Sequence, residues 1–128
     1  MNQEDYIEKQ IYQLGQVLKA MLSKFNLGSP PTSVAELTQE LRHSISLENV
    51  NWEDSNRLSV MLEDDLWSAE NAEELLSILV VMAESTKDIQ DRNSIVENAN
   101  RIIEMIQQNT DTFNMKRFEL SERLNSLQ

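Results

Sequence analysis

The single histidine is the first residue to consider for chemistry, because imidazole is a common metal ligand and titrates near neutral pH. His43 follows Glu40 with the Glu-x-x-His spacing of di-iron helical bundles, in which both side chains face one metal. Such a site needs a second copy of this motif and two further glutamates, and the chain has one histidine in all. We therefore interpret His43 as a polar residue near a helix C-terminus, where a cation is stabilised, and we expect no metal.

A group of acidic residues in the middle of the chain is the second candidate for chemistry. It consists of Glu53, Asp54, Glu63, Asp64 and Asp65. A helix–loop–helix calcium site needs a glycine within its loop, and residues 63–74 contain none. A glycosidase pair needs two carboxylates that face each other across a cleft, which nothing in this sequence indicates. We interpret the group as solvated surface and keep Glu63, Asp64 and Asp65 as candidate interaction residues.

Nucleophile and phosphate-binding motifs are absent from the sequence. The two glycines, Gly15 and Gly28, open no nucleotide-binding loop, and no Gly-x-Ser-x-Gly motif occurs. The basic run at 116–118 includes a phenylalanine, but it is short and is balanced by Glu119 and Glu122. A solvated helix face explains it better than nucleic-acid binding. We expect no enzymatic activity, no cofactor and no nucleic-acid partner.

Two tryptophans, Trp52 and Trp67, lie in the acidic part of the chain, where the helical pattern is least regular. In the simpler interpretation they close the ends of a helical bundle and each indole N–H finds a hydrogen-bond partner. In the alternative they are exposed anchors for another protein, because tryptophan is enriched at interface hot spots. Both stay open, and both tryptophans belong to the candidate interaction surface.

The composition is that of a globular helical protein. The chain has 128 residues, of which 40% are hydrophobic, with only two glycines and two prolines. So few turn-forming residues favour long helices over strands, and the length fits one domain, residues 1–128. No stretch approaches 18 apolar residues, so we expect no membrane span. The chain contains no cysteine and begins without the basic segment of a signal peptide, which favours a cytoplasmic location.

The net charge of −11 is concentrated in the middle of the chain. Residues 32–90 contain thirteen acidic and three basic side chains, a formal charge of −10. This segment repels phosphate backbones and anionic membranes. It is either a solvated face that aids solubility or a patch that receives a basic partner.

Six helices are expected from hydrophobic spacing and capping residues. The first is the clearest, because its apolar residues recur at steps of four and three, and Gly28 and two prolines end it. Those residues are Ile7, Ile11, Leu14, Leu18, Met21 and Phe25. The stripe forms either an internal core or the seam of a homodimer. Gly15 lies inside this helix at a cost of about 1 kcal/mol relative to alanine, which either a close helix–helix contact or simple tolerance explains.

Capping residues place the starts of three later helices. Ser33 and Glu36 have the spacing of a capping box, Ser68 is a second cap, and Asp111 or Thr112 is a third. The resulting helices are expected at approximately 3–26, 33–45, 52–64, 69–85, 92–108 and 112–127. Short links between the last three make them antiparallel neighbours. The expected fold is all-α: a five- or six-helix bundle or a short tetratricopeptide-like helical array.

Two segments resemble a known family. Residues 4–15, EDYIEKQIYQLG, are similar to the start of a family of small uncharacterised bacterial proteins, and residues 111–119, DTFNMKRFE, are similar to their ending. The two segments together make up about a sixth of the chain. It implies an all-α domain with tetratricopeptide-like helical hairpins. It implies no function, and it carries over no catalytic residue.

Three functions compete at this point. The leading hypothesis is a non-enzymatic helical module for protein–protein interaction or scaffolding, with an unknown protein partner or a homodimer through the first helix. The second is a small enzyme that uses surface carboxylates, which would need a pocket of convergent acids. The third is an acidic mimic that binds a basic protein, and its binding would be sensitive to salt. Membrane binding is not expected, since the first helix has no basic face.

Overall fold

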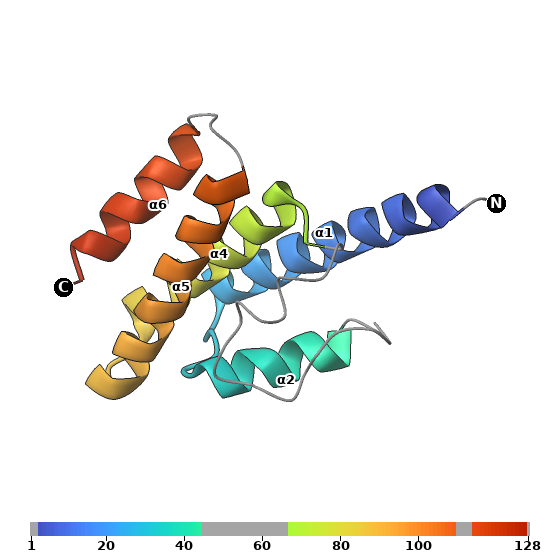
Figure 1. Cartoon of the computed structure of the whole chain (residues 1–128). Helices are drawn as coiled ribbons and strands as arrows, with labels where there is room; N and C mark the ends of the chain where they lie inside the picture. The colour runs from blue at the N-terminus through green and yellow to red at the C-terminus, as the bar shows by residue number, and fades with distance from the viewer. Residues whose placement is uncertain (1–2, 45–66, 110–113, 128) are drawn as a thin grey trace.

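The structure is a computed structural model that describes residues 3–44, 67–109 and 114–127. Within these ranges the chain is all-α and forms a packed helical bundle (Figure 1). Its helices are α1 (Gln3–Leu27), α2 (Val34–Ser44), α4 (Ala69–Ser85), α5 (Ile89–Asn109) and α6 (Met115–Asn125). The predicted fold class is confirmed. The helix expected at 52–64 lies outside the described residues.

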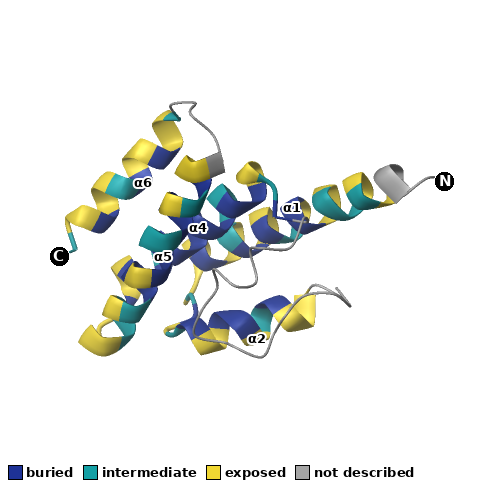
Figure 2. Cartoon of the chain, viewed as in Figure 1, coloured by how far each residue is buried: buried dark blue, intermediate teal, exposed yellow. Residues whose placement is uncertain are grey.

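The central helix is α4, which packs against α1, α5 and α6. Its side chains are buried almost all round, because apolar residues occupy every face between Leu75 and Ala83 rather than one stripe. Leu75, Ile78 and Leu79 are fully inaccessible to solvent. The run Ile78–Val81, the most strand-like in the sequence, therefore lies within the most deeply buried helix. Figure 2 shows dark blue along α4 and on the facing sides of its neighbours.

The apolar stripe of α1 is divided between the core and the surface. Leu14, Leu18 and Phe25 are buried and belong to the hydrophobic core, which confirms the intramolecular interpretation for this part of the stripe. Ile7 and Ile11, nearer the N-terminus, are only half-buried. In Figure 1 the N-terminal turns of α1 reach beyond the start of α4, so the stripe continues past the helix that covers it.

The start of α2 differs in detail from the predicted capping box. The Ser33 hydroxyl oxygen accepts a hydrogen bond from the Glu36 backbone N–H at 3.2 Å, as expected. The Glu36 carboxylate, however, accepts from the Thr32 backbone N–H at 2.9 Å and from the Thr32 hydroxyl at 3.1 Å. The reciprocal bond is thus made one residue earlier than the motif predicts.

The three later helices begin with side-chain caps. The Ser68 hydroxyl oxygen accepts from the Asn71 backbone N–H at 3.2 Å, which confirms the predicted cap of α4. α5 starts three residues earlier than expected, because Asp88 Oδ1 accepts from the Asp91 backbone N–H at 3.0 Å. The cap of α6 is Asn114, where we expected Asp111 or Thr112, and its Oδ1 accepts from the Arg117 backbone N–H at 3.0 Å.

Hydrogen bonds of Thr86 join the end of α4 to the start of α5, and the two helices form an antiparallel hairpin. At the C-terminus of α4 the Thr86 hydroxyl donates to the Met82 carbonyl oxygen at 2.7 Å. The Thr86 carbonyl oxygen accepts two bonds from the Arg92 guanidinium, from Nε at 3.2 Å and from Nη2 at 2.7 Å. Only residues 86–88 separate the two helices, and these hydrogen bonds hold the last turn of α4 to the first turn of α5.

No described helix is both long enough and apolar enough to cross a membrane.

Candidate interaction surface

Of the five predicted site residues, only Trp67 lies in the described part of the chain. Trp67 is buried, with 9% of its surface exposed, and it packs in the hydrophobic core. It therefore belongs to the core and does not form an exposed anchor. Its indole N–H has no hydrogen-bond partner among the described residues, contrary to our expectation. The other candidates, Trp52, Glu63, Asp64 and Asp65, lie outside the described residues.

His43 lies exposed in the last turn of α2, together with Arg42. With Glu40 it borders an open hollow of about 400 Å³ between the end of α1 and α2, which Lys24 and Phe25 also line. Among the residues that the structure describes, no three histidine, aspartate or glutamate side chains are placed to hold a metal ion.

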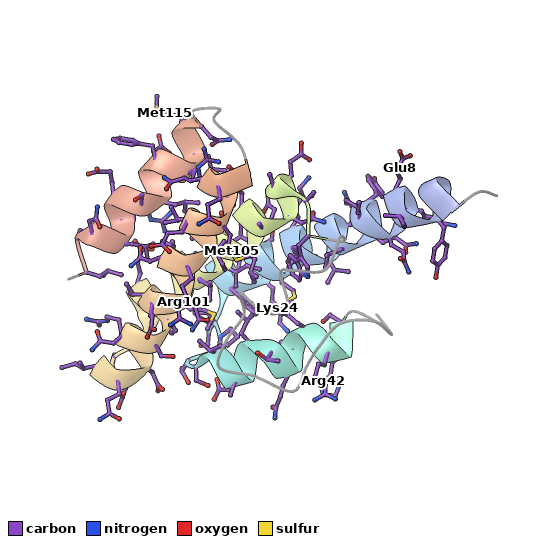
Figure 3. The ribbon with its side chains drawn as sticks, in the orientation of Figure 1. Glu8, Lys24, Arg42, Arg101, Met105 and Met115 are labelled. Atoms are coloured by element: carbon purple, nitrogen blue, oxygen red, sulfur yellow. The ribbon has the colours of Figure 1, made fainter. Side chains whose placement is uncertain are left out.

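A second hollow, of about 480 Å³, lies between α1 and the start of α4. α1 supplies Ile11, Tyr12 and Gly15 to its lining. The Tyr12 side chain is 67% exposed. The charged residues that line it are Glu8, Lys19, Glu70, Glu73 and Glu74. Figure 3 shows Glu8 projecting from α1 on the side away from α2. We call this region the α1–α4 hollow.

Gly15 and Asn71 bring the two helices close together beside the α1–α4 hollow. Asn71 is 4% exposed and its Nδ2 donates to the carbonyl oxygen of Ile11 at 3.0 Å. A Cβ atom at position 15 would lie 2.9 Å from Asn71 Oδ1, closer than real Cβ contacts. The close contact between α1 and α4 therefore explains why a glycine occupies position 15 inside a helix. Simple tolerance of a glycine in mid-helix is not needed to explain it.

Because of this contact, we expect Gly15→Ala to lower the free energy of unfolding by about 1 kcal/mol. The added methyl displaces the Asn71 amide, an overpacking cost of about 2 kcal/mol, which exceeds the helix propensity gained of about 1 kcal/mol. Urea unfolding measures the difference. Gly28→Ala is the matched control, because the nearest atom to its added Cβ is the Lys24 carbonyl oxygen at 3.5 Å, an ordinary contact. Equal effects of the two substitutions would contradict the interpretation.

Three ion pairs join α4 to α6. Glu73 Oε1 lies 3.1 Å from Arg117 Nη1, and both side chains are nearly buried, at 12% and 10% exposed. Glu74 Oε1 lies 3.0 Å from Lys116 Nζ. Glu84 accepts two bonds from the Arg123 guanidinium, and this hydrogen bonding raises the pKa of Arg123 above its ordinary value. We call these pairs the α4–α6 ion-pair row.

The ion-pair row corrects our interpretation of the basic run at 116–118 as a solvated face. Lys116 and Phe118 are exposed, but Arg117 is buried, with 8% of its surface exposed. The sequence contained a signal for this burial, because Arg117 precedes Leu120 and Leu124 at steps of three and four and therefore shares their apolar face.

No known protein family matches this chain. Neither a curated protein nor a solved structure matches it. The surface is therefore interpreted from its own residues.

Proposed function

We propose that this domain is a non-enzymatic helical module that binds another protein through the N-terminal half of α1 and the adjoining α1–α4 hollow. The observation that carries the proposal is the exposure of two tyrosines on this helix. Tyr6 is 55% exposed and Tyr12 is 67% exposed. Tyrosine is enriched at protein interfaces, because its ring buries a large area at a low entropic cost while its hydroxyl keeps a polar contact.

The neighbours of the tyrosines support the same surface. Gln10 Nε2 donates to the Tyr6 hydroxyl oxygen at 3.0 Å, which restrains that ring before any partner binds. The half-buried Ile7 and Ile11 continue the apolar stripe of α1 between the tyrosines. Two exposed tyrosines that flank an apolar stripe fit a protein surface better than a small polar substrate.

Three further features support a non-enzymatic role, a helical scaffold and a cytoplasmic location. Glu73 and Glu74 are held in ion pairs with α6, so these carboxylates are engaged in structure rather than free for acid–base chemistry. The antiparallel α4–α5 hairpin supports a tetratricopeptide-like scaffold. The absence of cysteine supports the cytoplasm as the location that we propose for this function.

Site-specific photo-crosslinking in cells tests the proposal. A benzophenone amino acid in place of Tyr12 is expected to give a discrete cross-linked protein species. The same group in place of Gln90, which is exposed on α5, is expected to give none. A species of twice the mass of the chain would identify the partner as a second copy, and therefore a homodimer through α1. Cross-linking that is absent at Tyr12, or equal at the two positions, would refute the proposed surface.

A further inference from the structure

The face of α4 that bears Glu73 and Glu74 already binds two basic side chains of another helix within the chain. α6 lies along it and contributes Lys116 and Arg117 to the α4–α6 ion-pair row. The Glu74–Lys116 pair is the more open of the two pairs at this end, with the Lys116 side chain 47% exposed. The structure thus shows what chemistry this face accepts: lysine and arginine side chains carried on a helix.

Two glutamates of the α4–α6 ion-pair row, Glu73 and Glu74, also line the α1–α4 hollow, where further glutamates join them. Glu73 and Glu74 line the hollow together with Glu70, one turn earlier on α4, and with Glu8 on α1. Glu70 and Glu8 are exposed and have no ion-pair partner among the described residues. Lys19 is the one cationic residue among the described residues that line the hollow. The hollow therefore carries an excess of negative charge next to an interface already built on ion pairs.

Tyr12 adds a contact that suits a long basic side chain. Its ring is two-thirds exposed and belongs to the same lining as the glutamates. A lysine or arginine can lay its aliphatic stem along such a ring while its charged end reaches a carboxylate. A guanidinium or ammonium over the ring face gains a cation–π interaction in addition.

We propose that the α1–α4 hollow binds a lysine- or arginine-bearing segment of a partner protein, which extends the α4–α6 ion-pair row to Glu70 and Glu8. This inference rests on the proposed function and names the chemical class of its partner. At about 480 Å³ the hollow accepts the side chains of a short segment. A second copy of this chain suits the hollow poorly, since each copy carries a net charge of −11.

Peptide binding to the full chain tests the inference. The probe is a synthetic 16-residue alanine-based helix with lysines on one face, and the comparison peptide has glutamine at each lysine position. At low ionic strength, where exposed charges are weakly screened, we expect calorimetry to detect the lysine peptide and not the glutamine peptide. Glu8→Gln combined with Glu70→Gln is expected to weaken binding of the lysine peptide about tenfold.

A matched variant separates the site from the overall charge of the protein. Glu104→Gln combined with Glu122→Gln removes the same charge from exposed glutamates that do not line the hollow, and we expect it to change the affinity less than twofold. Equal weakening by the two variants, or no binding of the lysine peptide to the wild-type chain, would overturn the inference. Circular dichroism confirms that both variants keep their helices, as exposed substitutions should.

The cellular cross-link distinguishes this inference from the proposed function. If Tyr12 captures a partner, and Glu8→Gln with Glu70→Gln lowers the yield severalfold, both stand. If the yield is unchanged by this variant, the basic-segment inference fails while the interaction module stands. If the peptide binds as expected but Tyr12 captures nothing in cells, the assignment of cellular function fails while the preference of the hollow for basic segments stands.

Discussion

Leu79→Ala should lower the free energy of unfolding by about 3 kcal/mol, within the range of about 2–5 kcal/mol for leucine truncation in a core. Leu79 is completely buried in α4, the helix that packs against α1, α5 and α6, and the removed atoms leave a cavity in the core. A loss of this size is a large fraction of the stability of an ordinary domain, about 5–15 kcal/mol. The expected midpoint of urea unfolding is correspondingly lower.

Leu27→Ala provides the matched control for this prediction. The substitution is chemically identical, but Leu27 is 92% exposed at the end of α1. Its removal leaves no cavity, and we expect a change within about 0.5 kcal/mol. Similar losses at the two leucines would show that α4 is not the centre of the core in solution.

The helices could be predicted from the sequence because their apolar residues follow a regular period. α1 carries such residues over several turns, and its predicted range, 3–26, lies close to Gln3–Leu27. α4 is apolar almost all round, and the length of its apolar run and its flanking residues gave the range 69–85, which matches Ala69–Ser85. Ser68 added a local signal, since a cap acts within one turn of its own helix. Local periodicity and local caps are therefore sufficient for elements of this length.

The contacts between helices that shape the candidate interaction surface were harder to predict, because they join residues far apart in the chain. Glu73 and Arg117 are separated by 44 positions, and Asn71 reaches Ile11 across 60. Neither pairing follows from the sequence near either residue. Both polar residues do lie on the apolar face of their helix, Asn71 four positions before Leu75 and Arg117 three before Leu120. A polar residue on such a face indicates a buried contact, although its partner remains unknown without the fold.

Among the ion pairs of the described residues, the nearly buried pair between Glu73 and Arg117 should contribute most to stability. In Glu73→Gln the Arg117 guanidinium keeps its charge and loses its ion pair with the Glu73 carboxylate. Breaking a fully buried pair costs about 3–5 kcal/mol, and because 12% and 10% of these side chains remain exposed, we expect about 2 kcal/mol. Glu97→Gln is the control: its pair with Arg101 is exposed, at 63% and 42%, and should contribute less than about 0.5 kcal/mol.

Two further measurements separate loss of the charge pair from a general loss of packing. The double variant Glu73→Leu with Arg117→Met removes both buried charges, so it should be more stable than Glu73→Gln, which keeps the buried Arg117 charge without the Glu73 carboxylate. Hydrogen exchange in Glu73→Gln should accelerate first in α6, because this helix depends on the ion-pair row for its attachment to α4. If Glu73→Gln lowers the free energy of unfolding no more than Glu97→Gln does, the Glu73–Arg117 pair does not stabilise the attachment of α6 to α4. The attachment of α6 would then depend on other contacts, chiefly those of Leu120 and Leu124, which are buried on the same face as Arg117.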